Sequence, residues 1–182
     1  MLRIISRSEK ETIDFGSRLV RLLSGGDIVC LFGTLGAGKT ILVKGMAKGL
    51  GINKDEVISP SFVLIREYRR DKRAKAGIPL YHFDLYRLKN PRDILNLGYE
   101  EYFYNQGITV IEWAERMAGY LPPEFLKVEI EIKGTTERAI RLTAKGQRYR
   151  NILKKSRKNL GTLLPPIGEL SRRQSEECPR KK

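Results

Sequence analysis

The segment Gly33–Thr40 reads GTLGAGKT and satisfies the pattern G-x-x-x-x-G-K-[ST] in full. Glycines in such a loop let successive backbone N–H groups point at one anion, and the positive end of the next helix dipole assists them. In this chemistry Lys39 reaches the β- and γ-phosphates, and the Thr40 hydroxyl binds Mg²⁺. The predicted phosphate-binding residues are Gly33, Thr34, Leu35, Gly36, Ala37, Gly38, Lys39, Thr40 and Ile41.

Two acidic residues end apolar segments downstream of this loop. Asp84 ends IPLYHFD, and Glu112 ends ITVIE. Hydrolysis at a phosphate loop needs an acidic residue for Mg²⁺ and a group that orients the attacking water. By apolarity alone Glu112 is the better metal acid, because Tyr81 and His82 dilute the strand before Asp84. For each residue the alternative is a solvated carboxylate at a strand end.

Strands and helices around the loop are expected to bring these side chains together. The apolar run Ile28–Phe32 predicts a buried strand before the loop, and Thr40–Leu50 predicts a helix after it. A capping-box pattern at Ser8 and Glu11 begins another helix, which we expect to continue to about Leu23.

Two later segments, LKVEIEI and RAIRLTA, alternate apolar and polar residues with period two. This alternation is typical of antiparallel strands with one solvated face. We therefore predict an α/β protein with the P-loop NTPase fold, in which helices flank a central mixed β-sheet that includes a C-terminal antiparallel strand pair.

The positive charge lies mainly at one end of the chain. Of a net charge of +14, residues 145–182 carry +9 and residues 1–144 carry +5. The basic, polar composition of the end predicts a P-loop ATPase domain at 1–144 and an extension at 145–182 that is disordered or weakly helical. The sequence has no apolar run near the roughly 20 residues that cross a bilayer, and its N-terminus lacks a signal-peptide pattern. We expect a cytoplasmic protein without a membrane partner.

Five motifs occur in an order that resembles one known family. They are GTLGAGKT, SPSF, YHFDLYRL, LGYEEYF and VIEWAER. Together they resemble the TsaE family, also called YjeE, the P-loop ATPase of bacterial tRNA threonylcarbamoyladenosine biosynthesis. GAGKT is shared by many ATPases, whereas HFDLYRL and IEW are much more specific. The resemblance covers about residues 1–143.

The resemblance implies roles for the residues that match its motifs. Asp84 takes the first acidic position and Glu112 the second, near Mg²⁺ and the γ-phosphate. Trp113 matches the family tryptophan beside that glutamate, and this position favours a role beside the nucleotide over a plain core role. The implied metal ligands are Thr40, Asp84 and Glu112, and the implied catalytic residues are Glu112, Asp84 and Lys39.

Two further segments match the family less sharply. Ser59-Pro60-Ser61 matches a switch-like S-P-T element near the γ-phosphate, with Ser61 in place of the usual threonine, so the hydroxyl is kept. The start of the first helix, around Glu9 and Thr12, lies near the adenine in the family.

The implied function is a Mg²⁺-dependent ATPase that acts on other proteins. TsaE-like proteins work with TsaD-like and TsaB-like partners, which transfer a threonylcarbamoyl group to the tRNA adenosine next to the anticodon. ATP hydrolysis is expected to reset that complex between turnovers and to be slow alone. Slow intrinsic hydrolysis is typical of P-loop proteins without an arginine finger. No arginine in residues 1–144 lies in an obvious finger motif, although Arg87 and Arg116 stay open as groups supplied in cis.

Other interpretations of these features stay open. A small-molecule kinase would need an acceptor pocket and usually an arginine-rich lid. The loop RRDKRAKAG could mimic such a lid, but at its length it is more simply a hairpin turn. A nucleotide-switched binding module would bind ATP without turnover. The basic extension is a solubilising segment, a direct tRNA contact or a tether to a partner. His82, the only histidine, is given no catalytic role, because a lone histidine in a strand is usually structural.

Overall fold

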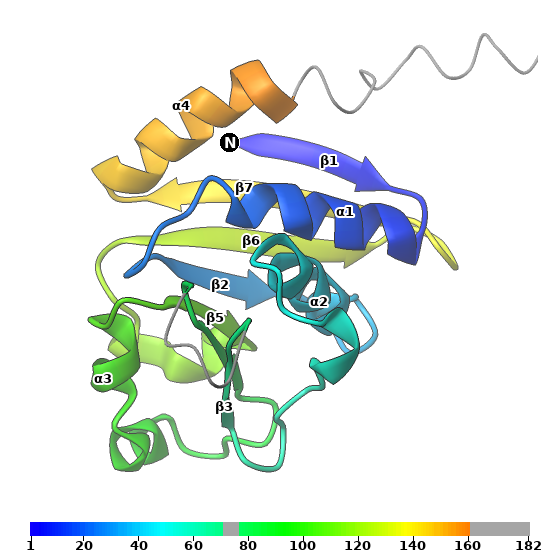
Figure 1. The fold of residues 1–182 in the computed structure, drawn as a ribbon. Helices are drawn as coiled ribbons and strands as arrows, with labels where there is room; N and C mark the ends of the chain where they lie inside the picture. Colours follow the sequence, from blue (N-terminus) through cyan, green and yellow to red (C-terminus); the bar gives the residue numbers. More distant parts are fainter. Residues whose placement is uncertain (71–76, 161–182) are drawn as a thin grey trace, which may run out of the picture.

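The computed structural model describes residues 1–70 and 77–160, which form one seven-stranded mixed sheet with helices packed on it (Figure 1). The loop predicted over RRDKRAKAG lies mostly outside the described residues. The strand order is β1-β7-β6-β2-β5-β4-β3. The strands are β1 (Leu2–Ser6), β2 (Ile28–Phe32), β3 (Ile65–Tyr68), β4 (Leu80–Asp84), β5 (Ile108–Glu112), β6 (Phe125–Ile132) and β7 (Arg138–Lys145).

The sheet is parallel at its centre and antiparallel toward both edges. β2 pairs in parallel with β5 and β6, and β5 pairs in parallel with β4. β3 pairs antiparallel with β4, and β1 pairs antiparallel with β7. β6 and β7 pair antiparallel along their whole length, which confirms the predicted C-terminal strand pair. The carboxyl ends of β2, β4 and β5 therefore meet at one edge, where ligands bind in open α/β sheets.

Two apolar clusters cover the two faces of the sheet. The first contains side chains of α1 and α2, which lie together on one face (Figure 1). A Cβ at Gly45 of α2 would lie 2.3 Å from the carbonyl oxygen of Ile13 in α1, so glycine permits this close approach. The second cluster contains side chains of α3 and of the 3₁₀ segments η2 and η3. The helical elements are α1 (Glu9–Val20), α2 (Lys39–Gly49), η1 (Lys54–Glu56), η2 (Pro91–Leu97), α3 (Tyr99–Phe103), η3 (Ala114–Tyr120) and α4 (Gln147–Leu160).

The predicted helix beginning at Ser8 is present but shorter than expected. The Ser8 hydroxyl accepts a hydrogen bond from the Glu11 amide at 3.1 Å, as the N-cap pattern predicted. The Glu11 carboxylate accepts a hydrogen bond from the backbone amide of Arg7 instead of that of Ser8, so the capping box is incomplete. α1 ends at Val20 instead of near Leu23. None of the helices in the described residues is long and apolar enough to span a bilayer.

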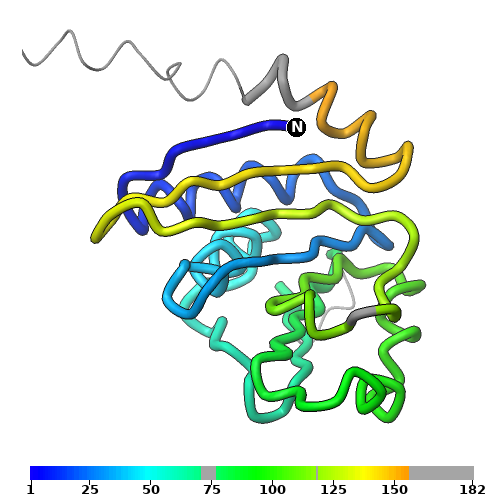
Figure 2. The backbone as a smooth tube through the Cα atoms, turned by 180° about the vertical axis from the view of Figure 1, so that it is seen from behind, coloured from blue at the N-terminus to red at the C-terminus, as the bar shows by residue number. Residues whose placement is uncertain are grey.

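The helix α4 follows β7 directly and lies beside the N-terminus in both views (Figures 1 and 2). Tyr149 is 2% exposed, and its hydroxyl accepts a hydrogen bond from the Ile28 amide of β2 at 2.7 Å. Arg148 donates to both carboxylate oxygens of the buried Asp27, at 2.5 and 3.0 Å. The first turns of the basic extension therefore pack on the sheet, whereas residues 161–182 lie outside the described residues.

The packing of α4 gives a prediction about the boundary after Ala144. We expect a chain ending at Ala144 to unfold at a lower temperature than one ending at Leu160. Its free energy of unfolding should be lower by several kcal/mol. Removing α4 exposes the apolar side chains that Tyr149 and Leu153 cover. It also leaves Asp27 without the cation of Arg148. Thermal unfolding of the two truncated proteins measures the difference, and equal melting temperatures would show that residues 1–144 are stable without α4.

Candidate functional site

The phosphate loop joins the end of β2 to the start of α2. Gly36 and Gly38 have φ angles of +76° and +98°, in the left-handed region that favours glycine. Gly38 is the N-cap of α2, which begins at Lys39. The loop therefore presents the backbone N–H groups of a helix N-terminus, the arrangement that binds phosphate oxygens.

Lys39 is buried and held against the loop and against Trp113. Its ammonium group donates hydrogen bonds to the carbonyl oxygens of Gly33 at 2.7 Å and Thr34 at 3.0 Å. Its Nζ atom also lies 3.8 Å from the centroid of the Trp113 ring. Burial lowers the pKa of Lys39 below its ordinary value, although the carboxylate of Glu112 opposes the shift. Trp113 thus lies beside the lysine of the phosphate loop.

The two acidic residues occupy paired positions on adjacent parallel strands, since Asp84 of β4 lies opposite Glu112 of β5. Both are almost fully buried, at 3% and 2% exposed. The Thr40 hydroxyl reaches both Glu112 oxygens, at 2.8 and 3.1 Å. Asp84 accepts hydrogen bonds from the Ser59 hydroxyl and from the Tyr86 amide. The alternative of solvated carboxylates is therefore wrong for both residues.

These groups line one hollow of about 450 Å³. Its lining comprises residues 35–41, Ser59 and Ser61 of the switch-like segment, both acids, Trp113, and two residues of the segment after β4, Tyr86 and Arg87. The structure thus brings most predicted site residues together. Pro60 lies between the two serines, and Gly33 and Thr34 take part through the Lys39 bonds.

A second hollow of about 220 Å³ adjoins the same loop at Gly36, Gly38 and Ile41. It is lined by Glu9 and Thr12 of α1 and by Thr135, Thr136 and Arg138 at the turn between β6 and β7. The two hollows adjoin at the phosphate loop, since Gly36, Gly38 and Ile41 line both.

Arg138, which no sequence motif marks, also contacts the phosphate loop. Its Nε donates to the Ala37 carbonyl oxygen at 3.1 Å, and one Nη donates to that of Gly36 at 3.3 Å. The residue begins β7, about a hundred positions from the loop, and its segment reads only as an alternating strand. No sequence signal marks this contact, because the pairing of β6 with β7 creates it.

Arg87 and Arg116, the two candidates for a charge supplied in cis, differ in their access to the hollow. Arg87 lines it and lies over the Phe62 ring, with 4.0 Å between the guanidinium carbon and the ring centroid. Arg116 donates a hydrogen bond to the Leu88 carbonyl oxygen at 2.9 Å and is not part of the lining. Of these two, Arg87 is the better candidate for a charge supplied in cis.

The chemistry of the acidic edge suits Mg²⁺. Thr40, Asp84 and Glu112 offer oxygen atoms, which Mg²⁺ prefers, and two carboxylates supply negative charge. The described residues contain no group of three or more His, Cys, Asp or Glu side chains that could hold a metal. Mg²⁺ is usually held by one or two carboxylates together with substrate phosphates rather than by a protein cage.

Comparisons with known proteins identify the family. The sequence model described as threonylcarbamoyl adenosine biosynthesis protein TsaE matches residues 6–140. The chain belongs to the TsaE family. The tRNA threonylcarbamoyladenosine biosynthesis protein TsaE of Treponema pallidum is 40% identical over 139 residues, which cover 76% of this chain and 98% of that protein. The protein of the same name from Bacillus subtilis is 44% identical over 124 residues, covering 68% of this chain and 73% of that protein.

A solved structure supports the fold of this TsaE family member. The crystal structure of YdiB from Bacillus subtilis matches it with a TM-score of 0.70 and 35% identity, covering 87% of this chain and 95% of that chain. The predicted α/β P-loop fold and the resemblance to the TsaE family are therefore both confirmed.

Proposed function

We propose that this TsaE family member is a Mg²⁺-dependent ATPase that supports tRNA threonylcarbamoyladenosine formation by acting on a TsaD–TsaB transferase complex. One observation carries the proposal: the hydroxyl of Thr40 contacts Glu112, with Asp84 at the paired position beside it. Thr40 and Asp84 would hold the ion, which neutralises charge on the phosphates when bound. Glu112 would orient the attacking water or hold the ion through water.

The surroundings of the hollow support action on a partner. Several apolar side chains at or near its rim are strongly exposed, including Leu35 at 70%, Phe62 at 81% and Val63 at 63%. Phe62 and Val63 follow the switch-like segment directly, so a docked partner would touch the residues that respond to the γ-phosphate. Apolar and aromatic side chains supply the central area of protein interfaces. We propose that docking of the transferase completes the site and raises a slow intrinsic rate of ATP hydrolysis. This hydrolysis takes place between turnovers of the transferase, in the cytoplasm.

The destination of the γ-phosphate distinguishes this ATPase function from a small-molecule kinase and from a nucleotide-switched binding module. Labelled ATP, incubated with the protein, its two proposed partners and tRNA, should release inorganic phosphate. Transfer of the label to an added metabolite would instead support a kinase. Bound ATP that stays intact even in the complete mixture would support a nucleotide-switched binding module.

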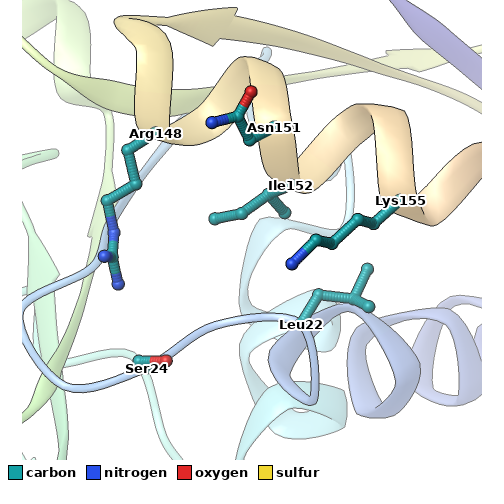
Figure 3. Close-up of a pocket in the computed structure, with 6 residues that line it drawn as sticks. All are labelled: Leu22, Ser24, Arg148, Asn151, Ile152 and Lys155. Atoms are coloured by element: carbon teal, nitrogen blue, oxygen red, sulfur yellow. The ribbon is translucent and has the colours of Figure 1, made fainter.

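A direct tRNA contact through α4 is part of the proposal. Arg150, Lys154 and Lys155 are exposed, and the sequence of α4 has six basic residues and no acidic one. Figure 3 shows Arg148 and Lys155 projecting from α4 toward the loop of Leu22 and Ser24, around a hollow of about 300 Å³. The excess of basic over acidic residues in α4 favours a phosphate backbone as its partner.

We expect replacement of Lys154 and Lys155 by Gln to weaken tRNA binding and to flatten its salt dependence. Each lost phosphate contact should reduce the slope of log affinity against log salt by about 0.7–0.9. Fluorescence anisotropy over a range of salt concentrations measures both quantities. The double variant Lys10→Gln/Lys89→Gln removes two exposed lysines outside α4 as a matched control. Equal slopes for the two double variants would remove α4 from the tRNA interface.

A further inference from the structure

His82 lies in the middle of β4, is 0% exposed and faces the same side of the strand as Asp84. Its Nε2 atom lies 2.8 Å from Oε1 of Glu112 on the neighbouring strand. A carboxylate oxygen accepts hydrogen bonds, so this contact calls for the His82 tautomer with the proton on Nε2. The lone histidine of the chain therefore contacts the proposed water-orienting residue directly.

The other ring nitrogen has no hydrogen-bond partner. Nδ1 of His82 is the one buried side-chain nitrogen or oxygen in the described residues without such a partner. The centroid of the Tyr68 ring lies 6.2 Å from that of the His82 ring. The Tyr68 hydroxyl is already bonded to the backbone amide and carbonyl of Ile58. A bare Nδ1 with the proton on Nε2 leaves no buried donor without an acceptor, so this tautomer suits the site.

Glu112 has two kinds of support in this arrangement, the Thr40 hydroxyl and the His82 ring. The Thr40 hydroxyl is the group that turns to Mg²⁺ in P-loop proteins. Once it does so, His82 is the remaining side chain, among those that the structure describes, that still donates to the Glu112 carboxylate. The histidine contact therefore matters most in the nucleotide-bound state.

We propose that His82 is a positioning residue, which holds the Glu112 carboxylate in place through its Nε2–H group while Thr40 serves the metal. The inference rests on the proposed ATPase function, and it replaces the purely structural role expected from the sequence. Replacement of His82 should therefore impair the hydrolysis step and Mg²⁺-dependent binding, with little effect on nucleotide binding in the absence of metal.

The first test needs no substitution, because the chain has one histidine. Nitrogen-15 NMR of histidine-labelled protein reports the two ring nitrogens of His82 alone. We expect a protonated Nε2 and a bare Nδ1. A proton on Nδ1 with a bare Nε2 would overturn the proposal, since Nε2 then has nothing to donate to Glu112.

The second test compares two amides. Gln places its N–H₂ group close to where Nε2 lies, whereas Asn reaches only to the position of Nδ1. We expect His82→Gln to keep kcat within about 3-fold and His82→Asn to lower it by roughly 10–100-fold, the scale of a lost outer-shell partner. Affinity for ADP without metal should be unchanged in both. Equal kcat losses in the two variants, or a loss of metal-free ADP affinity that matches the kcat loss, would overturn the proposal in favour of a packing role.

A third readout does not depend on hydrolysis. The chain has one tryptophan, Trp113, which lies in the site beside Glu112, so its fluorescence reports nucleotide binding there. The Mg²⁺ concentration for half of the nucleotide-induced change should rise about 10-fold in His82→Asn and stay near wild type in His82→Gln. Equal values in both variants would contradict the positioning role. Wild-type protein that binds Mg²⁺–ATP but never hydrolyses it would instead defeat the ATPase proposal and leave this comparison valid.

Discussion

Replacement of Glu112 by Gln is expected to lower ATP hydrolysis in the assembled complex by roughly 10²-fold or more, the scale for losing a positioned catalytic group. Gln keeps the size of Glu112 and a hydrogen bond with Thr40, but it removes the negative charge. ATP should still bind, because residues 33–40 supply most phosphate contacts. Phosphate release and nucleotide affinity, measured on the same preparation, separate the two effects.

Glu115→Gln is the matched control for this variant. Glu115 is exposed three positions further along the chain and also acts electrostatically on Lys39, so its loss tests for a mere change of local charge. It should leave hydrolysis near the wild-type rate. Normal hydrolysis by Glu112→Gln would refute the assignment of Glu112, and an equal loss in both variants would reduce its role to bulk electrostatics.

Asp84 should respond differently from Glu112, because its proposed role is to place the metal. It accepts hydrogen bonds from Ser59 and Tyr86, so Asp84→Asn also loosens the switch-like segment. The hydrolysis defect of Asp84→Asn should be partly rescued by more Mg²⁺.

Loss of Lys39 is expected to weaken ADP binding without metal by roughly 10–100-fold, the range for a lost hydrogen bond to a charged group. Its ammonium group bonds to the Gly33 and Thr34 carbonyls and would meet the β-phosphate from there. Thr40→Ala should change metal-free ADP affinity little, because Thr40 acts through Mg²⁺, and should lower hydrolysis instead. Equilibrium titration followed by Trp113 fluorescence measures both affinities.

A lysine elsewhere on α2 provides the control for Lys39→Ala. Lys48 is exposed and paired with Asp14 at 2.9 Å, so Lys48→Ala removes the same charge from the same helix away from the phosphate loop. Its ADP affinity should match that of the wild type. Equal losses of metal-free ADP affinity in Lys39→Ala and Thr40→Ala would contradict the separate roles given to these residues.

The parts of the site that were predictable from sequence are those with local signals. The P-loop pattern fixes Gly33–Thr40 between a buried strand and a helix, and motifs at strand ends identify Asp84 and Glu112. Family resemblance then selects among the chemistries that this pattern allows.

What the sequence could not supply depends on contacts between distant segments. Arg138 reaches the phosphate loop because β7 pairs with β6, and Tyr149 reaches β2 because α4 folds back over the sheet. His82 is unremarkable in its own strand and gains a role through the parallel pairing of β4 with β5. The overall composition of α4 is basic and polar, so it gave no sign that three apolar side chains pack the helix on the core. They are Tyr149, Ile152 and Leu153.

The central claim, that hydrolysis at this site resets the transferase, is tested most directly by counting modified tRNA per complex. The protein is combined with its TsaD-like and TsaB-like partners, the threonylcarbamoyl donor and excess tRNA, with either ATP or a non-hydrolysable analogue. The account predicts many modified tRNA molecules per complex with ATP and about one with the analogue, and the Glu112→Gln variant with ATP should behave like the analogue. Full multiple-turnover modification with the analogue, or with a Glu112→Gln protein that no longer hydrolyses ATP, would contradict it.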